Sequence, residues 1–89
     1  MILDREYLRK NFSSFNKRIK LDLRFKNIQS IQINAFNVVK KLLNLFLSNN
    51  QLSTLDKYIF NELEKLVRLE ISNNQLSTLD KETYNGIKN

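Results

Sequence analysis

SNNQLSTLDK stands at residues 48–57, and the same ten letters recur at residues 72–81. The offset between the two copies is 24 positions, and ten identities at one offset are far more than chance would give. Self-similarity at a fixed period is the signature of a repeat architecture, in which each structural unit stacks on the next. The rest of the chain can therefore be aligned to these two copies in steps of 24 residues.

Apolar residues outside the duplicated segment follow the same period. Those of residues 42–63 return 24 positions later as Leu66, Leu69, Ile71, Leu76, Leu79, Tyr84 and Ile87. One step back gives Leu21, Leu23, Ile28, Ile31, Phe36 and Val39, and a second step gives Tyr7, Phe12 and Phe15. The period predicts one domain, a fragment of a longer array, with a partial unit over residues 1–17 and full units over 18–41, 42–65 and 66–89.

Each full unit contains a short segment in which apolar residues alternate with other residues, at 19–23, 43–47 and 67–71. Alternation is the period of a β-strand with one buried face. A strand of about five residues is not stable alone, whereas parallel strands from stacked units share one core. The sequence therefore predicts adjacent parallel strands, with Leu45 beside Leu69.

The second half of each unit predicts a turn and a return segment. Asn50 and Asn74 follow the strands, where a side-chain amide can both donate to and accept from unpaired backbone groups. Asp56 precedes an apolar i, i+3 pattern and is a candidate N-cap for a helical or 3-10 segment. Apolar residues that we expect to point into the core from this half are Leu52, Leu55, Leu76 and Leu79, with an aromatic column of Phe36, Phe60 and Tyr84.

These residues resemble the leucine-rich repeat pattern LxxLxLxxNxLxxLxxxxFxxLxx, in the type found in Toll-like receptor ectodomains and secreted insect immune proteins. The resemblance implies an α/β solenoid, a right-handed coil with short parallel strands on its concave face and helical or 3-10 segments on its convex face. The chain departs from the pattern at Arg18, at Lys26 (with Asn27 one residue late), and at Asp56 and Asp80, where proline is usual.

The resemblance implies a non-catalytic, protein-binding role in innate-immune or receptor-like recognition. Concave solenoid surfaces are the usual binding faces. We predict that the partner-binding residues are Asp22, Arg24, Asn44, Phe46, Ser48, Arg68, Glu70 and Ser72. Phe46 is the strongest candidate, as an exposed aromatic anchor with a polar rim, and the alternative is that it packs on neighbouring side chains or an arginine stem. Phe25 is a weaker candidate of the same kind, and we favour the alternative that a shifted loop buries it.

The formal net charge is +6, and residues 1–26 contribute eight Lys or Arg against three Asp or Glu. A basic cluster comprises Lys17, Arg18, Lys20, Arg24 and Lys26. The alternative function is therefore an anion-binding domain for heparin, nucleic acid or acidic lipid. Nucleic acid is not the expected partner, because no aromatic interleaving or known motif accompanies the charges, and a solvated basic edge is the default interpretation.

Other features bound the function. The chain has no histidine and no cysteine, and no catalytic constellation is evident, so we expect no enzyme activity, no cofactor and no metal. The resemblance implies an extracellular, secreted protein, yet no signal peptide or membrane span is predicted, so the compartment stays open. Uncapped ends predict self-association. Asn11-Phe12-Ser13 matches the N-glycosylation sequon, but such a short motif often arises by chance and adds little to the functional prediction.

Overall fold

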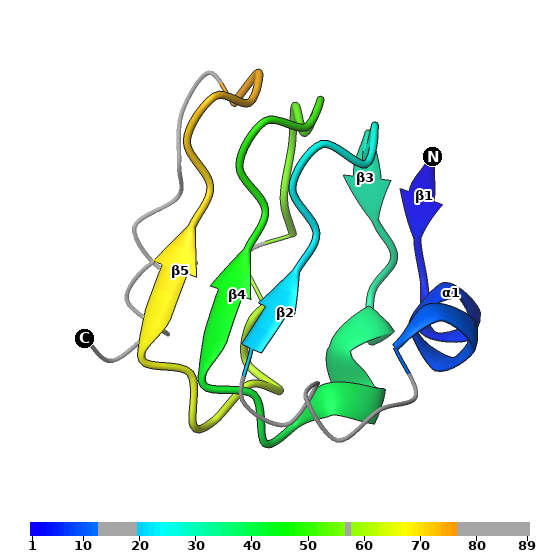
Figure 1. Cartoon of the computed structure of the whole chain (residues 1–89), viewed down its shortest axis with the longest axis vertical. Helices are drawn as coiled ribbons and strands as arrows, with labels where there is room; N and C mark the ends of the chain where they lie inside the picture. The colour runs from blue at the N-terminus through cyan, green and yellow to red at the C-terminus, as the bar shows by residue number, and fades with distance from the viewer. Residues whose placement is uncertain (13–19, 57, 77–89) are drawn as a thin grey trace.

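The computed structural model describes residues 1–12, 20–56 and 58–76. Figure 1 shows β5, β4 and β2 side by side, with β3 and β1 farther along the molecule toward α1. The elements in chain order are β1 (Ile2–Leu3), α1 (Arg5–Asn11), β2 (Lys20–Asp22), β3 (Ser30–Ile31), the 3-10 helix η2 (Ala35–Val39), β4 (Asn44–Phe46) and β5 (Arg68–Glu70). Several positions of the predicted repeat lie outside the described residues, among them Arg18, Phe15, Leu79 and Tyr84.

The strands form two small parallel sheets, one ordered β2-β4-β5 and the other β1-β3. In the larger sheet the central strand β4 pairs with both neighbours: Asn44 with Lys20 and Arg68, Leu45 with Leu21 and Leu69, and Phe46 with Asp22 and Glu70. Both pairs of neighbouring strands in this larger sheet have the 24-residue offset, so the predicted register of β2, β4 and β5 is confirmed. The pairing continues beyond the strands, where the Leu47 N–H donates to the Glu70 carbonyl at 2.7 Å.

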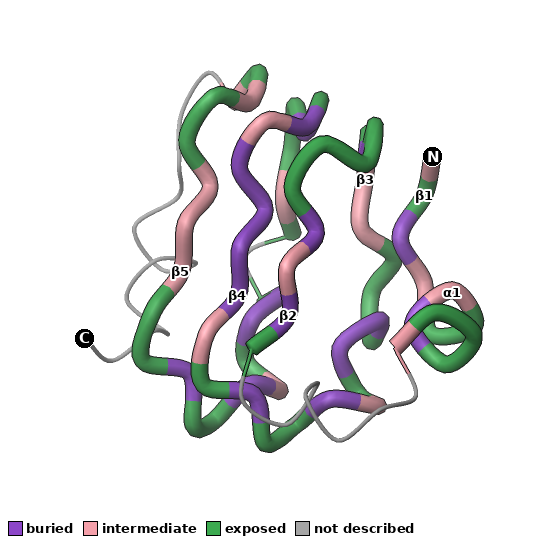
Figure 2. The backbone as a smooth tube through the Cα atoms, in the orientation of Figure 1, coloured by how far each residue is buried: buried purple, intermediate pink, exposed green. Residues whose placement is uncertain are grey.

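The core lies behind this sheet and is built from the residues that the period placed inward. Figure 2 shows the buried segments concentrated in β4 and in the segments that return behind it. Fully buried members include Leu21, Leu23, Ile28, Phe36, Leu42, Leu45, Leu47 and Leu52. Leu55, Leu69 and Leu76 are only partly buried and pack against this cluster. Burying one such side chain stabilises the fold by about 1.5–3 kcal/mol, so the stack depends on several coils sharing one interior.

The return segments follow the 3-10 pattern of i to i+3 hydrogen bonds. Residues 35–39 form η2, whereas residues 58–62 form consecutive turns rather than a helix. Asp56 caps these turns, as expected, because its carboxylate accepts a hydrogen bond from the Tyr58 N–H at 2.8 Å. The predicted aromatic column is present for Phe36 and Phe60, whose ring centroids lie 6.0 Å apart in a stacked arrangement.

Asn50 and Asn74 form the predicted asparagine ladder. The buried Asn50 amide donates to the carbonyls of Leu23 and Leu47, at 2.9 Å each, and its oxygen accepts from the N–H groups of Lys26 and Ile28. One side chain thus satisfies backbone groups of two successive coils. Asn74 repeats the arrangement one coil later, with bonds to the carbonyls of Leu47 and Ile71 and to the Leu52 N–H.

The N-terminal segment departs from the 24-residue register. One full period back from Ile31 leads to Tyr7, yet Ile31 pairs with Leu3, an offset of 28. Leu3 and Leu8 are fully buried, whereas Tyr7 and Phe12 are half-buried at the edge of the core. The reason is α1, which starts at the N-cap Asp4 and needs more residues than the return turns of later coils. Tyr7 and Phe12 therefore pack against the core from its edge, and the fully buried positions of this segment belong to Leu3 and Leu8, which the 24-residue register did not predict.

Candidate functional site

The outward side chains of β2, β4 and β5, with the residues that directly follow these strands, form what we call the strand face. The pairing places Lys20, Asn44 and Arg68 in one row and Asp22, Phe46 and Glu70 in the next. A third row follows, where the hydroxyls of Ser48 and Ser72 lie 3.2 Å apart. The structure thus brings together on this face all eight residues predicted to bind a partner, namely Asp22, Arg24, Asn44, Phe46, Ser48, Arg68, Glu70 and Ser72.

Phe46 occupies the centre of the strand face but is not exposed. Only 8% of its surface reaches solvent, which corrects the expectation of an exposed aromatic anchor. The charged ends of Lys20, Arg24 and Arg68 lie 5.2, 5.4 and 5.5 Å from its ring centroid. These distances are typical of cation–π contacts, and long basic side chains cover apolar surface with their stems. The alternative, packing on neighbouring side chains, therefore describes Phe46.

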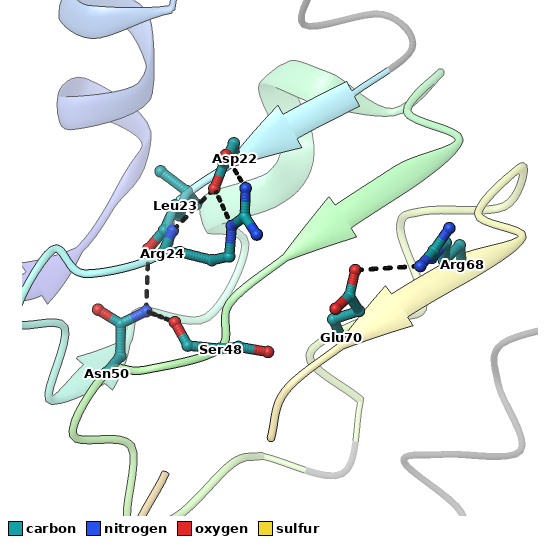
Figure 3. A network of polar contacts seen from close by, with 7 residues as sticks. All are labelled: Asp22, Leu23, Arg24, Ser48, Asn50, Arg68 and Glu70. Carbon is teal, nitrogen blue, oxygen red and sulfur yellow. Dashed lines mark hydrogen bonds and ion pairs between the residues drawn. The ribbon is translucent and has the colours of Figure 1, made fainter. Parts of the chain in front are cut away.

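Figure 3 shows two ion pairs on the strand face, Asp22 with Arg24 and Arg68 with Glu70. They belong to the two coils that flank the coil of Phe46. Arg24 contacts both carboxylate oxygens of Asp22, with its Nη2 2.7 Å from Oδ2. Arg68 lies 3.4 Å from Glu70. The Arg24 side chain, through its hydrogen bonds, lowers the pKa of Asp22 from 3.8 to about 2. The face therefore presents three cations and two carboxylates in fixed positions, with one cation in excess.

The backbone beneath the strand face is held rigidly by the asparagine ladder. Figure 3 shows Asn50 beside Ser48, directly below the Leu23–Arg24 segment that carries the first ion pair. Ser48 is 4% exposed, whereas Ser72 is exposed, so only the first of the two serines is more enclosed than its outward position predicted. Side chains supported in this way lose less conformational entropy when they bind, which favours recognition.

A feature that the sequence analysis placed wrongly is Phe25, at the end of the strand face. We expected a shifted loop to bury it, yet it is 74% exposed. The loop is not shifted, because Phe25, Asn49 and Asn73 share a left-handed backbone at the same position of successive coils. A hollow of about 320 Å³ beside it is lined by Asp22, Arg24, Phe25 and Lys26. The sequence did contain a sign that this position is unusual, because both later units have asparagine, Asn49 and Asn73, where this unit has phenylalanine.

The rest of the described chain adds two observations. Residues 1–12, 20–56 and 58–76 hold no group of three or more acidic, histidine or cysteine residues arranged to bind a metal. Within the same ranges, no helix has both the length and the hydropathy needed to cross a membrane. Of the basic cluster, Lys20, Arg24 and Lys26 are exposed, and Lys17 and Arg18 lie outside the described residues.

Comparison with known families agrees with this geometry. A family model described as Leucine rich repeat matches residues 20–76, which include all three strands of the larger sheet and both ladder asparagines. The chain belongs to the leucine-rich repeat family. No curated protein and no solved structure matches it. Leucine-rich repeat domains generally act as non-catalytic modules that bind other proteins, so the strand face of this repeat chain is its candidate site.

Proposed function

We propose that this leucine-rich repeat chain recognises a protein partner through its strand face, in an innate-immune or receptor-like role. The observation that carries the proposal is the cluster around Phe46, where three cations lie on one ring between two ion pairs. Preset charges of both signs give an interface specificity and orientation. The resemblance to the extracellular 24-residue type supports the innate-immune or receptor-like setting, and it makes a secreted protein part of the same proposal.

The proposal gives each residue a role. Asp22, Arg24, Arg68 and Glu70 supply charges to the partner, and Asn44 and Ser72 supply hydrogen-bonding groups. Ser48, which is only 4% exposed, supports the Ser72 hydroxyl from 3.2 Å away. Phe46 supports the cations from below and does not insert into the partner itself. Phe46→Ala is therefore a poor test, because it also removes a buried ring. Charge reversal at the exposed ion pair is the better one, since the side chains of Arg68 and Glu70 are 63% and 35% exposed.

A displayed library of random peptides, about twelve residues long, is selected on the full chain, and the enriched peptides are synthesised. Their affinities are then compared for two variants by fluorescence anisotropy. The first, Arg68→Glu with Glu70→Arg, keeps the net charge and the ion pair but reverses the pattern on the strand face. The matched control, Glu6→Lys with Lys10→Glu, reverses the exposed ion pair of α1.

The strand-face reversal is expected to weaken binding by about tenfold or more, the effect of losing about 1.4 kcal/mol, while the α1 reversal binds like the wild type. Equal affinities for both variants would contradict the proposal. We also propose that the chain can self-associate through the ends of the stack, which would compete with peptide binding. Sedimentation of the same samples measures this self-association.

The anion-binding alternative is favoured by one observation, the gathering of Lys20, Arg24 and Arg68 over a single ring. It predicts that heparin binds the chain and displaces every selected peptide, with an affinity that falls steeply as salt is raised. Retention on heparin only at very low salt would reject it.

A further inference from the structure

Phe25 stands at a backbone position that disfavours it. Its φ angle is 58°, and the equivalent Asn49 and Asn73 have φ angles of 62° and 57°. Asparagine is enriched in this left-handed region, whereas for a bulky side chain the same conformation is an energetically unfavourable outlier. The fold therefore imposes a left-handed residue here, and this coil fills the position with a residue poorly suited to it.

The ring gains little within the described chain in return. With 74% of its surface in solvent, it buries little apolar area, unlike Phe36 or Phe60 in the core. A residue that is both strained and exposed is not explained by stability, and such outliers are found at binding sites. Large aromatic side chains are also the commonest anchors of protein interfaces.

The surroundings of Phe25 indicate what would cover it. Arg24 and Lys26 flank the ring in sequence, and both line the hollow beside it together with Asp22. The Asp22 carboxylate is already bound by Arg24, so the patch has one cation in excess. Arg24 also lies 5.4 Å from the Phe46 ring centroid, which makes the patch continuous with the strand face. A partner that fits must offer carboxylates next to an apolar side chain.

The loop is also held in place before binding. The Lys26 N–H donates to the buried Asn50 amide oxygen at 3.0 Å, and the Arg24 N–H donates to the Asp22 carboxylate at 3.1 Å. Anchors presented on an ordered backbone lose less entropy on association. Arg24, Phe25 and Lys26 thus form a preorganised patch at the end of β2.

We propose that Phe25 is an interface anchor that packs on an apolar side chain of a protein partner, while Arg24 and Lys26 pair with acidic residues beside that side chain. The inference rests on the proposed function and deepens it, because it names the partner chemistry at one end of the strand face. An anionic lipid surface would also attract a phenylalanine between two cations, and the experiment therefore includes it.

The probes are two fluorescein-labelled peptides of about twelve residues, rich in Glu and Asp, that differ only at the centre, with leucine in one and serine in the other. Their binding to the full chain is measured by fluorescence anisotropy. The wild type is expected to prefer the leucine peptide. Phe25→Asn should lower the affinity for the leucine peptide by about tenfold and remove the preference, without loss of thermal stability. Ile33→Asn, at another exposed apolar residue, should change neither quantity.

The inference is overturned if Phe25→Asn binds the leucine peptide like the wild type, if the wild type shows no preference, or if neither peptide binds it. It is also overturned if Phe25 is needed only for binding to phosphatidylserine vesicles. The Arg68→Glu, Glu70→Arg variant separates this inference from the proposed function. If the strand-face variant no longer binds the selected peptides while Phe25→Asn binds the leucine peptide like the wild type, only the role of Phe25 as an anchor is contradicted.

Discussion

At the scale of single residues, position in the repeat determines the face on which a side chain leaves the backbone. It does not determine how far that side chain is exposed to solvent. Phe46 leaves the sheet on the outward side, yet it is buried, and the charged ends of Lys20, Arg24 and Arg68 lie over its ring. Phe25 was expected in a shifted loop and is exposed instead. The burial of Phe46 could not be predicted, because it depends on how long flexible side chains pack across coils. The departure at Phe25 was visible in the sequence, since Asn49 and Asn73 occupy the equivalent positions of the later coils. The asparagine ladder was predictable, since a turn with unpaired backbone groups needs a side chain that both donates and accepts.

Phe25→Asn is expected to stabilise the fold by about 1 kcal/mol, because asparagine tolerates the left-handed backbone better than phenylalanine does. The measurement is the free energy of unfolding in urea. Asn49→Phe is the matched change at the equivalent position one coil later, and it should destabilise by a similar amount. A stability loss for Phe25→Asn would show that the ring contributes to the fold.

Asn50→Ala should destabilise the fold by about 3 kcal/mol or more, since each buried polar group left without a partner costs about 1–3 kcal/mol. The change would leave the N–H groups of Lys26 and Ile28 and the carbonyls of Leu23 and Leu47 without this side chain. Asn74→Ala, at the less buried ladder position, should cost less. Equal losses in urea unfolding would contradict the ladder as described.

The Asp22–Arg24 contact predicts a pH effect. The pKa of Asp22 is lowered from 3.8 to about 2 in the folded protein, chiefly by hydrogen bonds from the Arg24 side chain. A lowered folded pKa means that the contact stabilises the fold above about pH 4, and that this contribution is lost as the pH falls from about 4 toward about 2. An NMR titration of the Asp22 carboxyl should show the low midpoint, and Arg24→Gln should raise it. A midpoint near 3.8 in the wild type would contradict the contact.

At the scale of elements, the strands were predictable and the N-terminal return segment was not. Strands β4 and β5 directly precede the two identical stretches at residues 48–57 and 72–81, so their register follows from the period alone. Residues 1–12 have no such duplicate, and the helix α1 sets an offset of 28 for the pairing of Leu3 with Ile31. The 24-residue period comes from coils whose return segments are short 3-10 turns. It does not hold for the first coil, whose return segment is the helix α1.

The register of α1 predicts which of its residues matters. Leu8 is fully buried, and Tyr7 is half-buried at the edge of the core. Leu8→Ala should therefore cost about 2–5 kcal/mol through the lost transfer energy and the cavity left behind. Tyr7→Ala should cost clearly less in the same urea unfolding measurement. The opposite order would favour the 24-residue alignment of this segment over the structure.

At the scale of the whole molecule, the fold depends on successive coils lying directly on each other at the 24-residue offset. The strand face, the cation cluster around Phe46 and the asparagine ladder all follow from this stacking, because each joins residues of different coils. The proposed partner contact depends on it in the same way, since Arg24 and Arg68 come from opposite strands of the sheet.

Engineered disulfides test this stacking most directly, because the natural chain has no cysteine to compete. Residues 44 and 68 pair across β4 and β5, and directly paired strand residues fall near the Cα separation of about 4.4–6.8 Å that a disulfide spans. Asn44→Cys with Arg68→Cys should cross-link under mild oxidation, with both thiols consumed. Asn44→Cys with Glu70→Cys, in which the second cysteine is displaced by two residues along β5, should cross-link far more slowly. Faster cross-linking of the displaced pair would contradict the stacked register.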